Sequence, residues 1–120
     1  VFDCGICSYA NQIKERVLGV SHETLEALGA VSRETAAQMA AGVRKLAQAD
    51  IGVSTTGIAG PDGGTDEKPV GLVYVGVDSE NYSTVLECRL SRGYRDEREL
   101  IRYLASSHAL RLALTAARKA

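Results

Sequence analysis

The sequence is poor in large aromatic side chains, with no tryptophan and one phenylalanine among 120 residues. Its core must therefore be built from leucine, valine, isoleucine and alanine. Positive charge is not in excess either, because 14 lysines and arginines stand against 15 acidic residues. This balance excludes the strongly basic surface of a general nucleic-acid binder, but it allows a local anion pocket. The sequence also lacks a run of about 20 apolar residues, so it contains no candidate membrane-spanning helix.

Cysteine is scarce and odd in number, with three residues, which does not favour a disulfide-bonded secreted scaffold. Cys4 and Cys7 form a Cys-x-x-Cys pair, a pattern that also occurs in redox and metal sites. Residues three apart in an extended strand point to opposite faces, so we expect the two sulfurs to diverge. We predict that these two cysteines and Cys88 are small buried apolar side chains. We expect no metal and no cofactor, and a cytoplasmic location.

Apolar periodicity and capping residues predict a single α/β domain over residues 1–120. The expected order is a strand (1–9), three helices capped by Asn11, Ser21 and Ser32, a strand (51–56), a glycine-rich loop (57–69), two antiparallel strands (70–77 and 82–90) and a helix from about Asp96 to the end. This order predicts a three-layer α/β/α sandwich with a mixed β-sheet. Ligands of such sheets bind beyond the carboxyl ends of the strands, which is where the glycine-rich loop begins.

The loop over residues 57–69 is the first candidate site. Four of the twelve glycines lie in it, and glycine allows successive backbone N–H groups to converge on an anion. Thr56, Thr65 and Lys68 add hydroxyl groups and a positive charge. A tight surface connection without function would have the same composition, although a loop of this length in a small domain favours function.

Lys14 and Tyr9 form the second candidate site. Lys14 lies near the start of the helix that Asn11 would cap, where the positive end of the helix disfavours a cation. Burial would lower the pKa of the amine further, and a neutral lysine can act as a general base toward a serine hydroxyl. Tyr9 could pass on a proton or stabilise an oxyanion. The alternative for Lys14 is a solvated surface lysine.

Arginines around the start of the last helix form the third candidate site. Arg98 and Arg102 are four residues apart and share a helix face, and guanidinium groups suit phosphate or carboxylate. Acidic residues are interleaved with them, namely Asp96, Glu97 and Glu99. A salt-bridged, solvated surface is therefore the alternative.

Taken together, these segments resemble the CinA C-terminal domain family. The resemblance rests on five segments: Thr56-Gly57-Ile58-Ala59-Gly60-Pro61-Asp62-Gly63-Gly64-Thr65, Lys68-Pro69-Val70-Gly71, Ser8-Tyr9-Ala10-Asn11-x-x-Lys14 with Leu18-Gly19-Val20, Gly29-Ala30-Val31-Ser32, and Arg98-Glu99-Leu100-Ile101-Arg102. They cover essentially the whole chain. Arg95 offers a second register for the last segment, and we assign Arg98.

The resemblance implies that the complete protein is a nicotinamide mononucleotide amidohydrolase, or deamidase. Such an enzyme hydrolyses the carboxamide of this nucleotide to nicotinate mononucleotide and ammonia without a cofactor. The implied catalytic residues are Lys14 and Tyr9. The implied substrate-binding residues are Thr56, Gly57, Ala59, Gly60, Gly63, Gly64, Thr65, Lys68 and Arg98.

The nucleophile implied by the resemblance is a serine in a Ser-Cys-Thr-Gly-Gly segment, which residues 1–120 do not contain. The chain begins at Val1 without a methionine, and we expect it to be the C-terminal part of a longer polypeptide that carries this serine upstream. The resemblance also implies a homodimer, and neither direct nucleic-acid binding nor membrane association is expected. The alternative function is a non-catalytic nucleotide-binding or interaction module of a competence- or damage-inducible protein.

Overall fold

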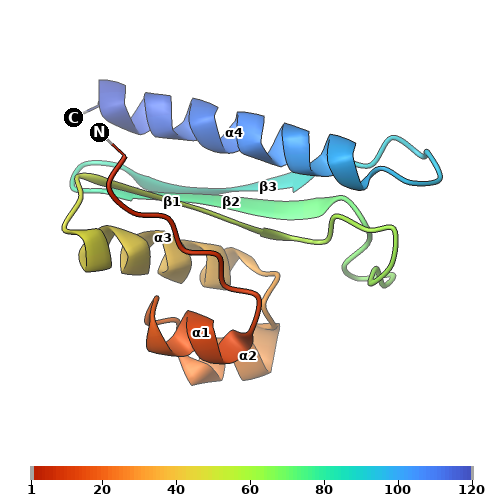
Figure 1. Cartoon of the computed structure of the whole chain (residues 1–120), viewed down its shortest axis with the longest axis horizontal. Coiled ribbons are helices and arrows are strands. Elements are labelled where there is room, and N and C mark those ends of the chain that lie inside the picture. Colours follow the sequence, from red (N-terminus) through yellow and green to blue (C-terminus); the bar gives the residue numbers. More distant parts are fainter. Residues whose placement is uncertain (1, 120) are drawn as a thin grey trace.

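In the computed structural model, which describes residues 2–119, helices and strands follow one another in nearly the predicted order (Figure 1). The elements are α1 (Asn11–Arg16), α2 (His22–Leu28), α3 (Arg33–Ala47), β1 (Ile51–Gly57), β2 (Leu72–Ser79), β3 (Ser83–Arg89) and α4 (Arg98–Arg118). None of the helices in residues 2–119 has the length and apolar character required to cross a bilayer.

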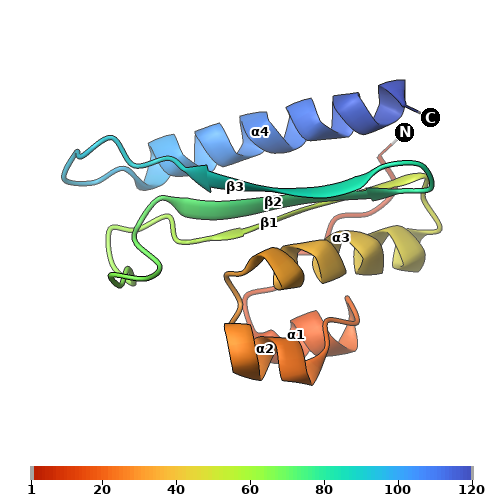
Figure 2. The ribbon, with the colours of Figure 1, turned by 180° about the vertical axis from the view of Figure 1, so that it is seen from behind.

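The sheet has the strand order β1-β2-β3 and separates two helical layers. Helix α3 packs on one face and α4 on the other, as both ribbon views show (Figures 1 and 2). Helices α1 and α2 lie outside α3, away from the sheet. The predicted three-layer α/β/α sandwich is thus confirmed.

The predicted strand at residues 1–9 is wrong for the residues that the structure describes; Val1 lies outside them. Residues 2–9 are extended and run in front of the sheet beside β1 (Figure 1), but their backbone makes no ladder hydrogen bonds. Both pairings in the sheet are antiparallel, so the parallel partner that would make the sheet mixed is absent from residues 2–119. An alternating pattern favours an extended backbone, but it does not specify a hydrogen-bonding partner.

Helix caps follow the sequence pattern at two of the three expected positions. The hydroxyl oxygen of Ser21 accepts a hydrogen bond from the backbone N–H of Thr24 at 3.1 Å. That of Ser32 accepts one from the backbone N–H of Thr35 at 3.0 Å. This satisfies donors that have no partner inside the helix. The prediction for Asn11 is wrong, because α1 starts one residue earlier than expected. Ala10 is its N-cap, and no side chain caps it.

Strand β2 forms the centre of the domain. Its valines, Val73, Val75 and Val77, are buried in a cluster with Ile101 and Leu112 of α4. Burial of such side chains from water is the dominant stabilising term in a domain of this kind.

The cysteines differ in exposure. Cys88 of β3 is buried, as predicted, whereas Cys4 is half-buried and Cys7 is exposed. The prediction for Cys7 is wrong, because nothing in residues 2–119 covers the outer side of this segment at Cys7.

A close contact between α3 and the turn after α1 fixes the position of α1. A Cβ atom built on Gly42 would lie 1.7 Å from the carbonyl oxygen of Leu18, so only glycine fits there. Leu18 is buried beneath α3, and the N–H of Val20 donates to the carbonyl of Lys14 at 3.0 Å. Through these contacts, α3 holds the helix that carries the candidate base.

We predict that Gly42→Ala destabilises the domain. Helix propensity alone would favour alanine by about 1 kcal/mol, but a conflict with the backbone of Leu18 should cost about 3 kcal/mol, which leaves a net loss of about 2 kcal/mol. Urea unfolding should therefore show a lower free energy of unfolding for the variant. Ala41→Gly, at the neighbouring exposed position, is the matched control and should lose only about 1 kcal/mol of helix propensity. A more stable Gly42→Ala variant would contradict the close packing.

Candidate active site

A cleft of about 920 Å³ lies at the open edge of β1, between residues 6–9 and α4. This volume is within the range of roughly 300–1,000 Å³ found for small-molecule sites. The cleft brings together six of the residues predicted from the sequence: Tyr9, Lys14, Thr56, Gly57, Ala59 and Arg98. Residues of α1, β1 and α4 thus line one cleft, although these elements are far apart in the sequence.

Lys14 lies on the α1 side of the cleft and is only 5% exposed. Its Nζ donates to the carbonyl of Ser8 at 2.6 Å. No carboxylate of residues 2–119 pairs with it. Burial lowers the pKa of the Lys14 amine, because a desolvated ammonium is less stable than a neutral amine. The surface-lysine alternative is therefore wrong, and Lys14 has the electrostatic setting of a general base.

Tyr9 lies at the rim of the cleft and is 87% exposed. It comes directly after Ser8, whose carbonyl holds the amine of Lys14. The same short segment therefore fixes the amine of Lys14 and places the phenol of Tyr9 at the rim of the same cleft.

The open edge of β1 contributes backbone donors. The N–H of Ile58 donates to the carbonyl of Leu72 at 3.0 Å. In the antiparallel β1–β2 ladder every second residue of β1 bonds to β2, so Ile58 and Thr56 face that strand. Gly57 and Thr55 consequently turn their backbone N–H and C=O groups away from β2, toward the cleft that both residues line. Outward N–H groups of this kind can stabilise a developing oxyanion.

Thr56 is buried, and its hydroxyl donates to the carbonyl of Ala30 at 2.6 Å. Its hydroxyl proton is therefore used to join β1 to the turn before α3. The next residue, Gly57, leaves no room for a side chain, because a Cβ would lie 2.6 Å from a methyl group of Val73. Both residues shape the wall of the cleft at the point where the loop begins.

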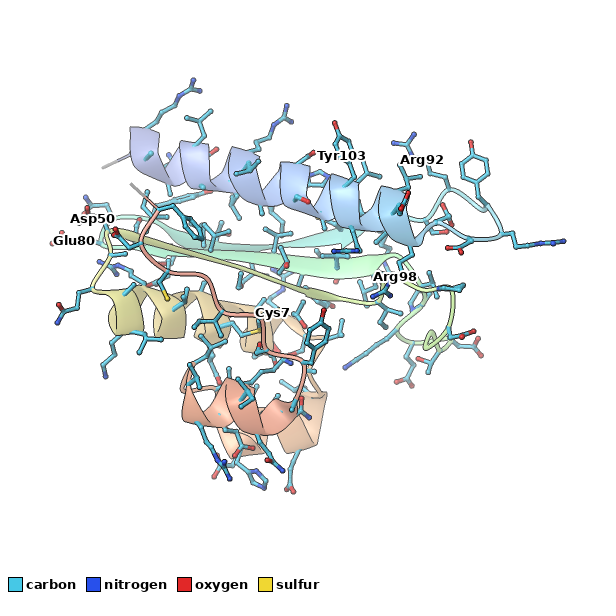
Figure 3. All side chains as sticks on the ribbon, viewed as in Figure 1. Cys7, Asp50, Glu80, Arg92, Arg98 and Tyr103 are labelled. Atoms are coloured by element: carbon cyan, nitrogen blue, oxygen red, sulfur yellow. The ribbon has the colours of Figure 1, made fainter. Side chains whose placement is uncertain are left out.

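Only the start of the glycine-rich loop reaches the cleft. Ala59 lines it, and the carbonyl of Gly60 accepts a hydrogen bond from Arg98 at 2.9 Å. Figure 3 shows Arg98 at the first turn of α4, extending toward the end of the sheet where this loop leaves β1. Arg98 thus joins the third candidate site to the first.

The remaining part of the loop lies apart from the cleft. Gly63, Gly64 and Thr65 are exposed and do not line it. Lys68 closes a small turn with Thr65, and its Nζ donates to the carbonyl of Leu28 at the end of α2. The predicted binding role of these four residues stays a prediction, but the structure places them outside the cleft that Arg98 and Lys14 line.

Helix α4 supplies further lining residues. Arg102, which the sequence analysis placed on the same helix face as Arg98, and Ser106, which it did not name, follow Arg98 along the cleft side of the helix. The expected salt-bridged surface is wrong, because no arginine between residues 92 and 102 pairs with a carboxylate of residues 2–119.

Glu97 was expected on a solvated surface, but it is buried. Its carboxylate accepts hydrogen bonds from the hydroxyl of Ser91 at 2.6 Å and from the backbone N–H of Arg92. The Ser91 hydroxyl and then the Arg92 N–H lower the pKa of the Glu97 carboxyl. Glu97 therefore holds Ser91 and Arg92 against the start of α4, where Arg98 is the first helical residue.

We predict that Glu97 contributes pH-dependent stability. Its folded-state pKa lies below the unfolded value of 4.5, so the contribution is present above that pH and is lost as pH falls through the folded-state pKa. The free energy of unfolding of the wild type should exceed that of Glu97→Gln by a constant amount near neutrality and by less in acid. Denaturant titrations at several pH values measure this difference. Glu99→Gln, which changes an exposed carboxylate, is the control, and an equal pH dependence in both variants would contradict the role of Glu97.

The site residues are those of acid–base chemistry and anion binding. Within residues 2–119, no three His, Cys, Asp or Glu side chains are grouped so that they could hold a metal ion. What the cleft does offer is a buried amine, a phenol, outward backbone N–H groups and two guanidinium groups.

Comparison with known proteins gives a consistent family match. The family model described as the CinA C-terminal domain matches residues 1–117. A competence-damage inducible protein of Thermoanaerobacter pseudethanolicus is 54% identical over 110 residues, which are 92% of this chain and 26% of that protein. A CinA-like protein of Desulfovibrio desulfuricans is 51% identical over the same shares. The chain thus spans about a quarter of the length of these curated relatives.

Solved structures show the same fold. The competence/damage inducible protein CihA of Agrobacterium tumefaciens matches with a TM-score of 0.85 and 41% identity, over 91% of this chain and 65% of that chain. A CinA superfamily protein of Escherichia coli matches with a TM-score of 0.79 and 33% identity, over 88% and 59%.

Proposed function

Because this chain belongs to the CinA C-terminal domain family, we propose that its cleft hydrolyses the carboxamide of nicotinamide mononucleotide. The products would be nicotinate mononucleotide and ammonia. The observation that carries the proposal is the buried Lys14 amine, with its lowered pKa, in a cleft whose opposite wall bears Arg98. The activity is that of the full-length protein, since the chain corresponds to about a quarter of its curated relatives.

In the proposed mechanism, the nucleophile is a serine of the Ser-Cys-Thr-Gly-Gly segment implied by the family resemblance, outside residues 1–120. The neutral amine of Lys14 accepts the proton of the serine hydroxyl as its oxygen attacks the carboxamide carbon. One outward backbone N–H at the open edge of β1, that of Thr55 or of Gly57, stabilises the oxyanion. The C–N bond then breaks, and the nitrogen leaves as ammonia after receiving a proton from Lys14 through Tyr9.

Hydrolysis of the acyl-enzyme completes the cycle. A water molecule gives a proton to Lys14 and attacks the ester carbon, and the serine oxygen leaves and recovers its proton. No net proton, electron or cofactor is consumed beyond the water. The carboxylate product keeps its phosphate, so the arginines of α4 bind substrate and product alike.

We predict that Lys14→Met in the full-length protein lowers kcat by about 10²- to 10⁴-fold, the usual contribution of a general base. Ammonia release from nicotinamide mononucleotide measures the rate, and calorimetry measures nucleotide binding, which should be retained. Lys45→Met, at an exposed position near the end of α3, is the matched control and should be fully active. Unchanged turnover in Lys14→Met would remove Lys14 from the mechanism.

The pH profile of the wild type provides a second test of the same residue. If Lys14 acts as a neutral amine, the active fraction of the enzyme grows as this amine loses its proton. We therefore predict that kcat/KM rises with pH through the lowered pKa of Lys14. A full-length protein that binds the nucleotide but releases no ammonia at any pH would instead be a nucleotide-binding module, the alternative function.

A further inference from the structure

We infer that Arg102 makes the cleft select a phosphorylated nucleotide over the corresponding nucleoside. This inference rests on the proposed function and adds a specificity-determining residue to it. Arg102 follows Arg98 by one turn of α4 and lines the same cleft. The cations of the cleft differ in how free they are to bind an anionic group.

Arg98 is partly engaged in holding the cleft together. Its guanidinium Nη1 donates to the carbonyl of Gly60 at 2.9 Å. This hydrogen bond links α4 to the start of the glycine-rich loop. Arg102 has no such tie, because its guanidinium makes no hydrogen bond or ion pair with any group in residues 2–119. All five of its N–H donors are therefore available, and a planar guanidinium can bind two phosphate oxygens at once.

Lys14 is unsuited to the phosphate. It is buried, its pKa is lowered and its Nζ is held by the carbonyl of Ser8. A group that loses its proton in the catalytic cycle is a poor permanent counter-charge, whereas an arginine is always charged. The cleft thus has a reactive side at Lys14 and an anion-binding side on α4.

The distal part of the glycine-rich loop does not compete for the phosphate. Its glycines do not line the cleft, and the amine of Lys68 is bound to the carbonyl of Leu28. One acidic residue, Glu99, also lines the cleft, and it would disfavour an anion that lacked a strong cationic partner. Arg102 is the residue placed to outweigh it.

The test compares nicotinamide mononucleotide with nicotinamide riboside, which lacks the phosphate, in the full-length protein. The wild type should have the higher kcat/KM for the nucleotide. Arg102→Gln should lower that preference by about 10- to 100-fold, the equivalent of one charged hydrogen-bonded contact, with kcat/KM for the riboside unchanged. Arg111→Gln, on an exposed part of α4 outside the cleft, is the matched control and should keep the wild-type preference.

The outcomes separate this inference from the proposed function. Equal losses on both substrates in Arg102→Gln, or no preference in the wild type, would overturn the role of Arg102 while leaving the amidohydrolase proposal intact. Absence of ammonia release from either compound in the wild type would refute the proposed function. In that case, calorimetry would compare the affinities for the two compounds and test the role of Arg102 separately. A preference for the nucleotide that Arg102→Gln abolishes supports this role, and an unchanged preference contradicts it.

Discussion

The organising constraint in this domain is that β1 is paired on only one side within residues 2–119. A backbone edge without a ladder partner carries N–H and C=O groups that must find other partners, and here alternate residues turn them into a cleft. The helical layers on the two faces of the sheet both extend to this edge. As a result, α1 from one side and α4 from the other place their charged side chains around the same backbone groups.

The two walls of the cleft are held by different kinds of contact. On the α1 side, the approach of Gly42 to Leu18 is steric, and it presses the helix that carries Lys14 against α3. On the α4 side, the contacts are polar: Glu97 gathers the preceding segment and Arg98 reaches the carbonyl of Gly60. Burial on the α1 side lowers the pKa of the Lys14 amine. On the exposed α4 side, the guanidinium groups stay charged.

Local features were predictable from the sequence, and long-range partners were not. Ser21 and Ser32 cap helices because the donors they satisfy lie three residues away. The alternation in residues 2–9 predicted an extended backbone, but the absence of a ladder partner depends on elements more than 40 positions distant. Lys14, Tyr9, Thr56 and Arg98 line one cleft, as expected, yet nothing in the loop composition indicated that its distal glycines would lie outside that cleft. Glu97 was missed for a different reason: its partners, the hydroxyl of Ser91 and the backbone N–H of Arg92, lie in an irregular segment whose path the sequence pattern does not specify.

The loop after β1 is braced at both ends by cations from elsewhere in the fold. The guanidinium of Arg98 grips a carbonyl near its beginning, and Lys68 near its end is anchored to the last turn of α2. Between these anchors, residues 61–67 are exposed. A substitution within this tip should therefore leave the wall of the cleft in place, because that wall is formed by the base of the loop and by α4. The two anchors thus separate the position of the wall from the composition of the tip.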